Sequence, residues 1–239
     1  KAKIFWKAPL GKSLVRFVPL KTNPETPFIE LYFHYQFGKR TIISPINFGE
    51  KDPMMEFAKN LGKSSDPEDW KLAKKIKPKM RVFAPVIVRG EEDKGVRFYE
   101  FGTQIYTTLM GLAADEEIGD FTDVMNGLDF KLDVVQGATY KESTIRPAMK
   151  QSPLSKDPKQ VEAWLSNQPD PIGFYSRFTF DEMKGFLEDW LNPDKEEEKT
   201  VVTTEKANAF PSEPGDVVTA STKKKEVVTA NEFDELFKD

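Results

Sequence analysis

The sequence predicts a mainly β fold with α additions, on the strength of three observations. Within the first 150 residues, several short segments show the alternating or β-branched apolar residues typical of strands. Capped segments with helical spacing interrupt these strands and then follow them, and regular spacing stops at Asn192. About five strands with a helix between strand groups predict a small Greek-key barrel of the OB type with insertions. A β-sandwich is the competing interpretation.

Two hairpins and two further strands make up the predicted barrel. The clearest alternation places the apolar residues from Leu128 to Val134 on one face of a strand. Pro85 has no N–H for a ladder and is expected at an edge or a bulge. Hairpins join the second strand to the third and the fourth to the fifth, with predicted strands over 13–20, 27–37, 40–44, 81–90, 95–102 and 128–137.

Helices are expected both between these strands and after them. The segment 52–62 begins with Asp52 as N-cap and Pro53 at the first helical position, and 104–115 has an apolar stripe. A helical segment over about 157–191 holds two more helices, the second opened by a capping box from Thr179 to Glu182. Both C-terminal helices are expected to pack on the barrel.

The chain is expected to divide into a core over 1–192 and a tail over 193–239. The core contains an inserted subdomain over about 28–65. The tail is polar and weakly repetitive, which is typical of disorder. Its tip is an acidic amphipathic segment suited to binding a protein partner, with the contact residues Phe233, Asp234, Glu235, Leu236 and Phe237.

Charge is distributed unevenly along this acidic chain, whose net charge is −4. Residues 194–239 carry 12 acidic and 7 basic side chains, which leaves residues 1–193 nearly neutral with 27 acidic and 28 basic. Within that neutral part, 59–89 has 9 basic and 3 acidic residues. A basic stretch beside a separate acidic tail indicates a polyanionic partner.

The residue types argue against an enzyme. His34 is the only histidine and cysteine is absent, so triads that use histidine or a thiolate nucleophile are excluded. The sequence has no glycine-rich phosphate loop. It also has neither an apolar run of membrane-spanning length nor a signal peptide, so a cytoplasmic protein is expected.

The basic segment 71–81 is the strongest candidate site, because its six cations are accompanied by no acidic residue. Such a run neutralises phosphates, and nearby aromatic rings can stack on unpaired bases. The alternatives are a solvated lysine face and aromatic rings that only fill the core. The candidates are Trp70, Lys71, Lys74, Lys75, Lys77, Lys79, Arg81, Phe83, Tyr99, Phe101, Tyr106, Tyr140 and Arg146.

The order of motifs resembles that of the single-stranded-DNA-binding, helix-destabilising proteins of T-even-type bacteriophages. The similarity runs over nearly the whole chain, and the two-helix segment and acidic C-terminus also match in position. No single motif is diagnostic, but seven matches in order are hard to obtain by chance. The motifs are "FWKAPLGKSLVRFVPLK", "PFIELYFHYQFGKRTII", "DWKLAKKIKPKMRVFAPVIV", "VRFYEFGTQIY" and "DFKLDVVQGATYKES".

The resemblance implies an OB-fold with an extra subdomain and non-sequence-specific binding of single-stranded DNA in phage replication, recombination and repair. Family cleft positions fall on or near Trp70, Phe83, Tyr99 and Tyr140, and its phosphate-contacting cluster falls on Lys74, Lys75 and Lys77. A loop over 141–150, which includes Arg146, would lie at the rim of the cleft. The alternative is an OB-type interaction module whose basic patch binds an acidic protein.

The resemblance also implies a zinc site of one histidine and three cysteines, from which this sequence departs. His34 matches the histidine, but the other positions fall near Ser44 or Pro45 and on Asp52 and Met55. A thioether and a lone carboxylate do not make a structural zinc site, so we expect no cofactor. Apolar packing of the helix 52–62 is expected in its place, with an Asp52–His34 hydrogen bond as a further possibility.

Partners implied by the resemblance are single-stranded DNA and, through the acidic tail, replisome and recombination proteins. The family's basic N-terminal arm, which mediates cooperative head-to-tail binding, is missing from this sequence, which begins at Lys1. Either that arm has been trimmed or self-association along DNA is arranged otherwise. No membrane association is expected.

Overall fold

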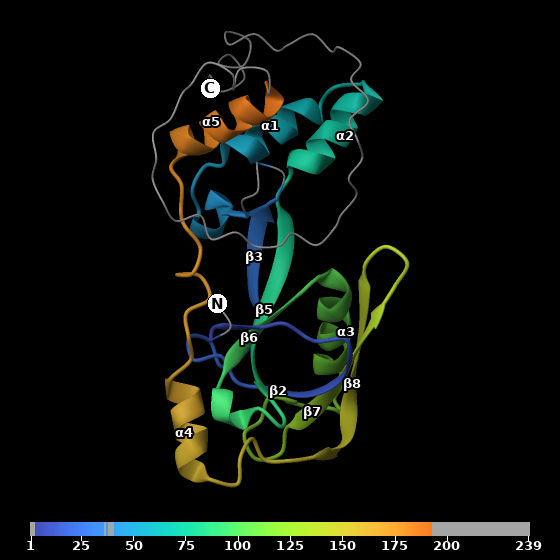
Figure 1. Ribbon diagram of the computed structural model, residues 1–239, viewed down its shortest axis with the longest axis vertical. Coiled ribbons are helices and arrows are strands. Elements are labelled where there is room, and N and C mark those ends of the chain that lie inside the picture. Colours follow the sequence, from blue (N-terminus) through green and yellow to red (C-terminus); the bar gives the residue numbers. More distant parts are fainter. Residues whose placement is uncertain (1–2, 36, 38–40, 193–239) are drawn as a thin grey trace. The chain divides into compact units, whose positions relative to one another are not determined.

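The computed structural model describes residues 3–35, 37 and 41–192 (Figure 1). The predicted tail over 193–239 therefore lies outside the described residues. The chain forms two compact units, of which unit 1 comprises Lys1–Leu31 and Met80–Phe174, and unit 2 comprises Tyr32–Lys79 and Tyr175–Asp239. The expected inserted subdomain over 28–65 overlaps unit 2, which also takes in residues up to Lys79 and those after Phe174.

The described part of the chain is mixed α/β, with an eight-stranded mixed sheet and five α-helices. Most of the sheet belongs to unit 1, in the order β1-β6-β5-β2-β7-β8. Its ladders are antiparallel except for β1 with β6, which is parallel. The strands are β1 (Phe5–Trp6), β2 (Gly11–Phe17), β5 (Lys79–Val88), β6 (Arg97–Phe101), β7 (Leu128–Gln136) and β8 (Lys141–Gln151).

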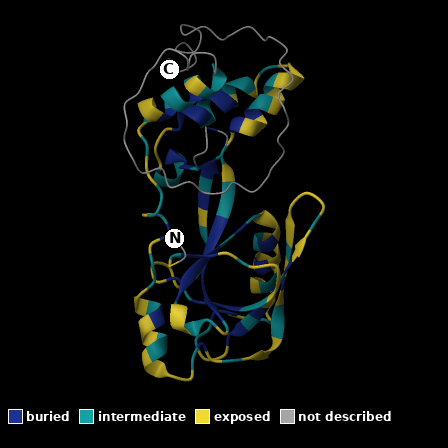
Figure 2. Ribbon diagram, viewed as in Figure 1, coloured by how far each residue is buried: buried dark blue, intermediate teal, exposed yellow. Residues whose placement is uncertain are grey.

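Apolar alternation builds the core of unit 1. On β7 the residues Leu128, Phe130, Leu132 and Val134 are all buried, as their spacing predicted, and they share a cluster with Val15 of β2. The strand β5 is instead buried on both faces from Val82 to Val88, as expected of a central strand (Figure 2). Helix α3 (Thr103–Ala113) adds its Ile105 and Leu109 to the same cluster.

Pro85 was predicted at a sheet edge or a bulge, but it lies within β5, between β6 and β2, and in regular register with Phe98 of β6. The ladder between β2 and β5 ends at the pair Phe17 and Val86, so the next pair along it would be Val18 and Pro85. The carbonyl of Pro85 accepts a hydrogen bond from Val18 N–H at 3.0 Å. Because the N–H and C=O of one strand residue point the same way, the missing N–H falls where that ladder stops, which explains how the strand tolerates the proline.

Besides the two-residue strand β1, two longer elements were missed by the sequence prediction. Residues 141–150, expected as a loop, form most of β8, which pairs with β7 from Gln136–Lys141 to Leu128–Gln151. This strand pairs on one side only, and Ile145 is its single buried residue, so its sequence shows no alternation. Helix α2 (Pro67–Ile76) forms most of the basic segment and begins at an Asp66 N-cap.

Unit 2 packs helices against a short hairpin. The end of β3 (Ile29–His34) pairs with β4 (Ile42–Ile43), and a 3-10 turn η1 (Pro45–Phe48) follows. The helices are α1 (Pro53–Leu61), α2 and α5 (Phe180–Leu191). Asp52 caps α1 and the Thr179–Glu182 capping box opens α5, both as predicted.

The two C-terminal helices pack in different units, so the prediction that both cover the barrel is wrong for α5. Helix α4 (Pro158–Ser166) buries Trp164 against Val18 and Ile87 in unit 1. The apolar stripe of α5 instead buries Met183 and Leu187 in a cluster that includes residues of α1. None of the helices in the described part of the chain is long and apolar enough to cross a bilayer.

A buried polar network ties together distant parts of unit 1. The Arg89 guanidinium holds both oxygens of Asp129, at 2.9 Å from Nη2 and 3.2 Å from Nε, and donates to Leu154 O at 2.9 Å. Arg16, which is fully buried, lies 3.6 Å from the same carboxylate and donates to Asp123 O at 2.6 Å. One carboxylate therefore serves two cations that join the sheet to the loops around it.

Replacing Asp129 with alanine should lower the free energy of unfolding by about 3–5 kcal/mol, because it leaves the charge of Arg16 buried without its carboxylate. Urea denaturation followed by circular dichroism measures this change. The control is Asp133→Ala on the same strand, where the carboxylate is half-buried and lies opposite the exposed Lys12. That change should stay within about 1 kcal/mol, and equal losses in the two variants would contradict the role given to Asp129.

Candidate nucleic-acid interface

The basic segment is largely a helix with an ordered charge pattern. Asp66 accepts a hydrogen bond from Glu68 N–H at 2.8 Å, and Pro67 occupies the first helical position. Acidic residues occupy the first turn of α2, and Lys74 and Lys75 occupy its last turn. This distribution complements the helix dipole, so the helix is stabilised locally while its C-terminal half is strongly cationic.

The buried face of α2 determines where these cations point. Ala73 and Ile76 are buried in the apolar core of unit 2. Trp70, Lys74 and Lys77 follow one another at a spacing of four and three residues, so they share a stripe along the flank of that buried face. We call these three residues the Trp70 stripe.

Trp70 is 63% exposed, which is unusual for so large an apolar ring. Its indole Nε1–H donates to Ser64 O at 2.9 Å, so the ring is anchored by one edge while its faces remain open. A fixed and exposed aromatic face is a platform on which a planar base can stack.

The lysines around this ring differ in what they contact. Lys71 Nζ pairs with Glu68 at 2.8 Å, and this hydrogen bond raises the pKa of the lysine. By contrast, within the described residues no carboxylate lies within ion-pair distance of four other exposed lysines. These are Lys74, Lys75, Lys77 and, at the start of β5, Lys79.

Three of the predicted aromatic residues of unit 1 are buried in its core. For these residues the alternative interpretation holds, namely that the rings only fill the core. Phe83 packs near Phe5, and Phe101 lies against Tyr99. Tyr99 packs edge-on against Trp6, and burial raises the pKa of its hydroxyl despite the opposing effects of Arg81 and a hydrogen bond with Ser143. In this conformation these rings present no face to solvent.

Two further predicted residues of unit 1 already have partners. Tyr106 is half-buried, with its ring edge-on to Phe28 and its hydroxyl donating to Glu30. Arg81 Nε donates to Glu100 at 2.8 Å, with both side chains about one-third exposed. A phosphate would have to compete with that carboxylate for Arg81.

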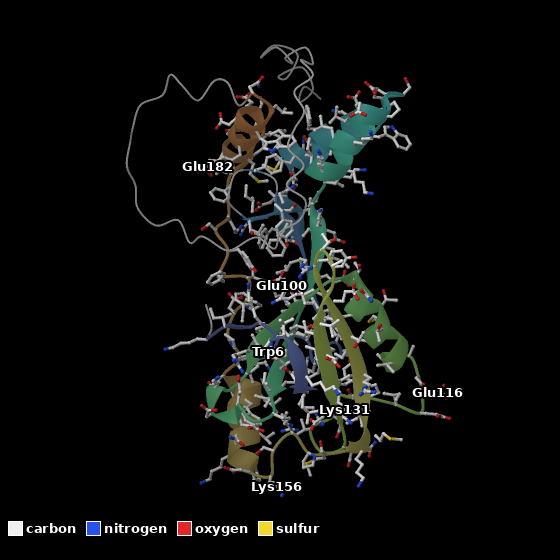
Figure 3. All side chains as sticks on the ribbon, turned by 45° about the vertical axis from the view of Figure 1, so that its right-hand side comes forward. Trp6, Glu100, Glu116, Lys131, Lys156 and Glu182 are labelled. Carbon is white, nitrogen blue, oxygen red and sulfur yellow. The ribbon has the colours of Figure 1, made fainter. Side chains whose placement is uncertain are left out.

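Tyr140 and Arg146 are the predicted residues of unit 1 that are open to solvent. Tyr140 is 62% exposed at the turn between β7 and β8, where Gly137 N–H donates to its carbonyl at 3.0 Å. Arg146 is exposed on β8 directly opposite Lys131 of β7, which Figure 3 labels. Lys131 was not among the predicted site residues. The alternation of β7 nevertheless places it on the outer face of the strand, whereas the next residue, Leu132, faces the core.

The positions that the resemblance assigns to zinc come together in unit 2. His34, Ser44 and Asp52 are all buried. His34 Nε2 lies 2.8 Å from Asp52 Oδ2, which also accepts the Ser44 hydroxyl, and Met55 N–H donates to Asp52 Oδ1 at 3.0 Å. Burial alone would raise the pKa of Asp52, but its hydrogen bond with His34 and the charge of that ring, together with the bonds from Ser44 and Met55, hold the pKa below its usual value.

This donor set does not fit the zinc site of the family. Both ring nitrogens of His34 are engaged, because Nδ1 lies 2.9 Å from Ile76 O. At the fourth position, Met55 contributes its main-chain N–H to the cluster. In the described part of the chain, no three His, Cys, Asp or Glu side chains converge as a metal site would require. The predicted Asp52–His34 hydrogen bond, however, is confirmed.

The predicted partner-binding residues 233–237 lie outside the described residues and are not placed.

Comparison with known proteins agrees with the resemblance found in the sequence. No curated protein matches the chain. Residues 10–183 match the family described as gp32 DNA binding protein like. Because this match covers most of the 239 residues, the chain belongs to the gp32-type family of single-stranded-DNA-binding proteins.

Proposed function

We propose that this protein coats single-stranded DNA without sequence preference during phage replication, recombination and repair in the host cytoplasm. The observation that carries the proposal is the Trp70 stripe, an anchored aromatic face in line with two lysines that have no acidic partner in the described structure. Proteins of the gp32-type family generally bind DNA rather than catalyse reactions on it. We also propose that the sheet of unit 1 is an OB-type Greek-key barrel, in keeping with its antiparallel ladders.

Binding would rest on two sequence-independent interactions. Lysines that neutralise phosphates release condensed counterions, so affinity falls as salt rises. A base stacked on Trp70 adds roughly 1–3 kcal/mol whatever its identity, because every base has a π-face. Neither interaction reads base edges, so the stripe favours binding without sequence preference.

The candidate residues do not contribute equally to the proposal. In unit 2 the DNA contacts are assigned to Trp70, Lys74, Lys75, Lys77 and Lys79. In unit 1 they are assigned to Tyr140, Arg146 and the newly found Lys131. Lys71, Arg81 and Tyr106 would join only by exchanging their carboxylate partners. The buried rings of Phe83, Tyr99 and Phe101 support the fold from within the core of unit 1.

Replacing Trp70 with alanine should weaken binding of oligo(dT) by roughly 5- to 150-fold, the equivalent of one stacked base. It should also abolish most of the quenching of tryptophan fluorescence on binding, since Trp6 and Trp164 are buried and Trp190 is partly buried against the core of unit 2. The matched control Trp70→Phe keeps an aromatic face and should retain most of the affinity. Both variants should melt near the wild-type temperature, because the ring is largely exposed.

The same titration separates this function from its alternative. If duplex DNA bound as tightly as oligo(dT), or if Trp70→Ala left the affinity unchanged, stacking on Trp70 would be excluded. If the wild-type protein bound acidic proteins but not oligo(dT), the interaction-module interpretation would replace the proposal.

The double variant Lys74→Gln/Lys75→Gln should reduce the salt dependence of oligo(dT) binding. Each phosphate contact contributes about 0.7 to the slope of log K against log salt for single strands, so the slope should fall by roughly 1.4. Titrations at several salt concentrations measure it. The control Lys59→Gln/Lys63→Gln removes equal charge from exposed positions at the end of α1, outside the proposed contacts. An equal loss of slope in that control would point to net charge rather than to α2.

We further propose that the acidic tip with Phe233, Leu236 and Phe237 recruits replisome and recombination proteins and competes with DNA for basic groups. Deleting residues 231–239 should therefore leave the melting temperature unchanged and leave oligo(dT) binding equal or tighter, with the larger gain at low salt. The affinity measured at two salt concentrations checks this. Weaker binding after the deletion would contradict competition by the tip.

A further inference from the structure

Four segments of unit 2 meet at one buried polar cluster. His34 ends β3, Ser44 precedes η1, Asp52 precedes α1, and Ile76 ends α2. The side chains of His34, Ser44 and Asp52 are all withdrawn from solvent. Segments separated by up to 42 positions are therefore joined through three side chains and one carbonyl. We call His34, Ser44 and Asp52 the Asp52 cluster.

Hydrogen bonding within the Asp52 cluster is mutually consistent. Ile76 O has no proton to give, so His34 Nδ1 must donate to it, at 2.9 Å. His34 Nε2 lies 2.8 Å from Asp52 Oδ2, which also accepts from the Ser44 hydroxyl, and Met55 N–H donates to Asp52 Oδ1. Both ring nitrogens of His34 and both oxygens of Asp52 therefore have hydrogen-bond partners within the cluster.

We infer that the Asp52 cluster is the structural cross-link of unit 2 and does with hydrogen bonds what a bound metal does in other small units. A structural metal fixes side chains from separate segments at one point, and here a single carboxylate does so. The cluster lies at positions where the family resemblance places a zinc ligand set, with Ser44 rather than Pro45 as the member between His34 and Asp52. This inference concerns stability and does not depend on DNA binding.

The substitution Asp52→Asn separates this role from helix capping. Asparagine caps helices as well as aspartate does, so the hydrogen bond from Met55 N–H can be kept. With its oxygen on Met55 N–H, the amide turns its NH2 group toward His34 and Ser44 and cannot accept from either, so these two hydrogen bonds are lost. The matched control is Asp157→Asn, the same change at the N-cap of α4, where the side chain accepts from Lys159 N–H.

We expect Asp52→Asn to lower the melting temperature of unit 2 by roughly 5–15 °C, as for the loss of one member of a buried polar network, and Asp157→Asn to change melting by about 2 °C or less. Hydrogen exchange read by peptide should lose protection in β3, α1 and the end of α2 but keep it in β2 and β7. If Asp52→Asn does not fold, Ser44→Ala removes one bond and should give a milder loss with the same pattern. Wild-type melting and exchange in the folded variants would overturn the inference.

Metal dependence provides an independent test. The wild-type protein refolded with excess zinc should contain no stoichiometric metal, and a chelator should leave its melting temperature unchanged. One bound zinc per chain whose removal lowers the melting temperature would overturn the inference.

The triple variant Ser44→Cys/Asp52→Cys/Met55→Cys should reverse this behaviour. With His34 it offers one imidazole and three thiolates, a set that suits tetrahedral zinc. We expect it to bind one zinc per chain and to melt at a lower temperature when a chelator is added. Failure of the folded triple variant to bind zinc would show that the Asp52 cluster does not occupy the place of a metal.

Discussion

Unit 2 depends on the carboxylate of Asp52. One oxygen caps α1 through Met55 N–H, and the other accepts from Ser44 and His34. A buried carboxylate is unfavourable unless its lone pairs are satisfied, and here each oxygen has a donor from a different segment. The apolar core alone does not specify which segments meet, because aliphatic contacts are not directional. The hydrogen bonds of Asp52 do specify it, and through His34 they reach the end of α2 at Ile76.

Unit 1 uses a carboxylate in a comparable way. Asp129 on β7 binds Arg89 through both oxygens and lies beside the buried Arg16. Burial lowers the pKa of Arg16 and the Asp129 charge opposes that effect, so the network keeps a charged guanidinium inside the protein. Both carboxylates anchor loops that leave a sheet or hairpin. In a chain without cysteine, charged hydrogen bonds thus provide directional links between segments distant in sequence.

Local signals allowed much of this fold to be predicted. The alternation on β7, the Asp52 cap and the Thr179–Glu182 capping box all behave as their sequence implies. Asp66 followed by Pro67 is the same helix-start signal as Asp52 followed by Pro53, so α2, which was missed, could have been predicted from it. The edge strand β8 could not be found by alternation, because one buried residue gives no period. The packing of α5 in unit 2 depends on contacts that no local pattern reports.

The candidate site was predictable in residue type but not in exposure. Trp70 and Phe83 look alike in sequence as aromatic residues at the two ends of the basic segment, yet Trp70 is exposed and Phe83 is buried. What separates them is the face of the element: α2 turns Ala73 and Ile76 inward and leaves Trp70 on its flank, whereas β5 is covered on both sides. The basic segment therefore changes character along its length. Its helical part presents cations to solvent, and from Val82 onward the chain is buried in the sheet, so the stacking that we propose is assigned to the helix, whereas the strand packs in the core.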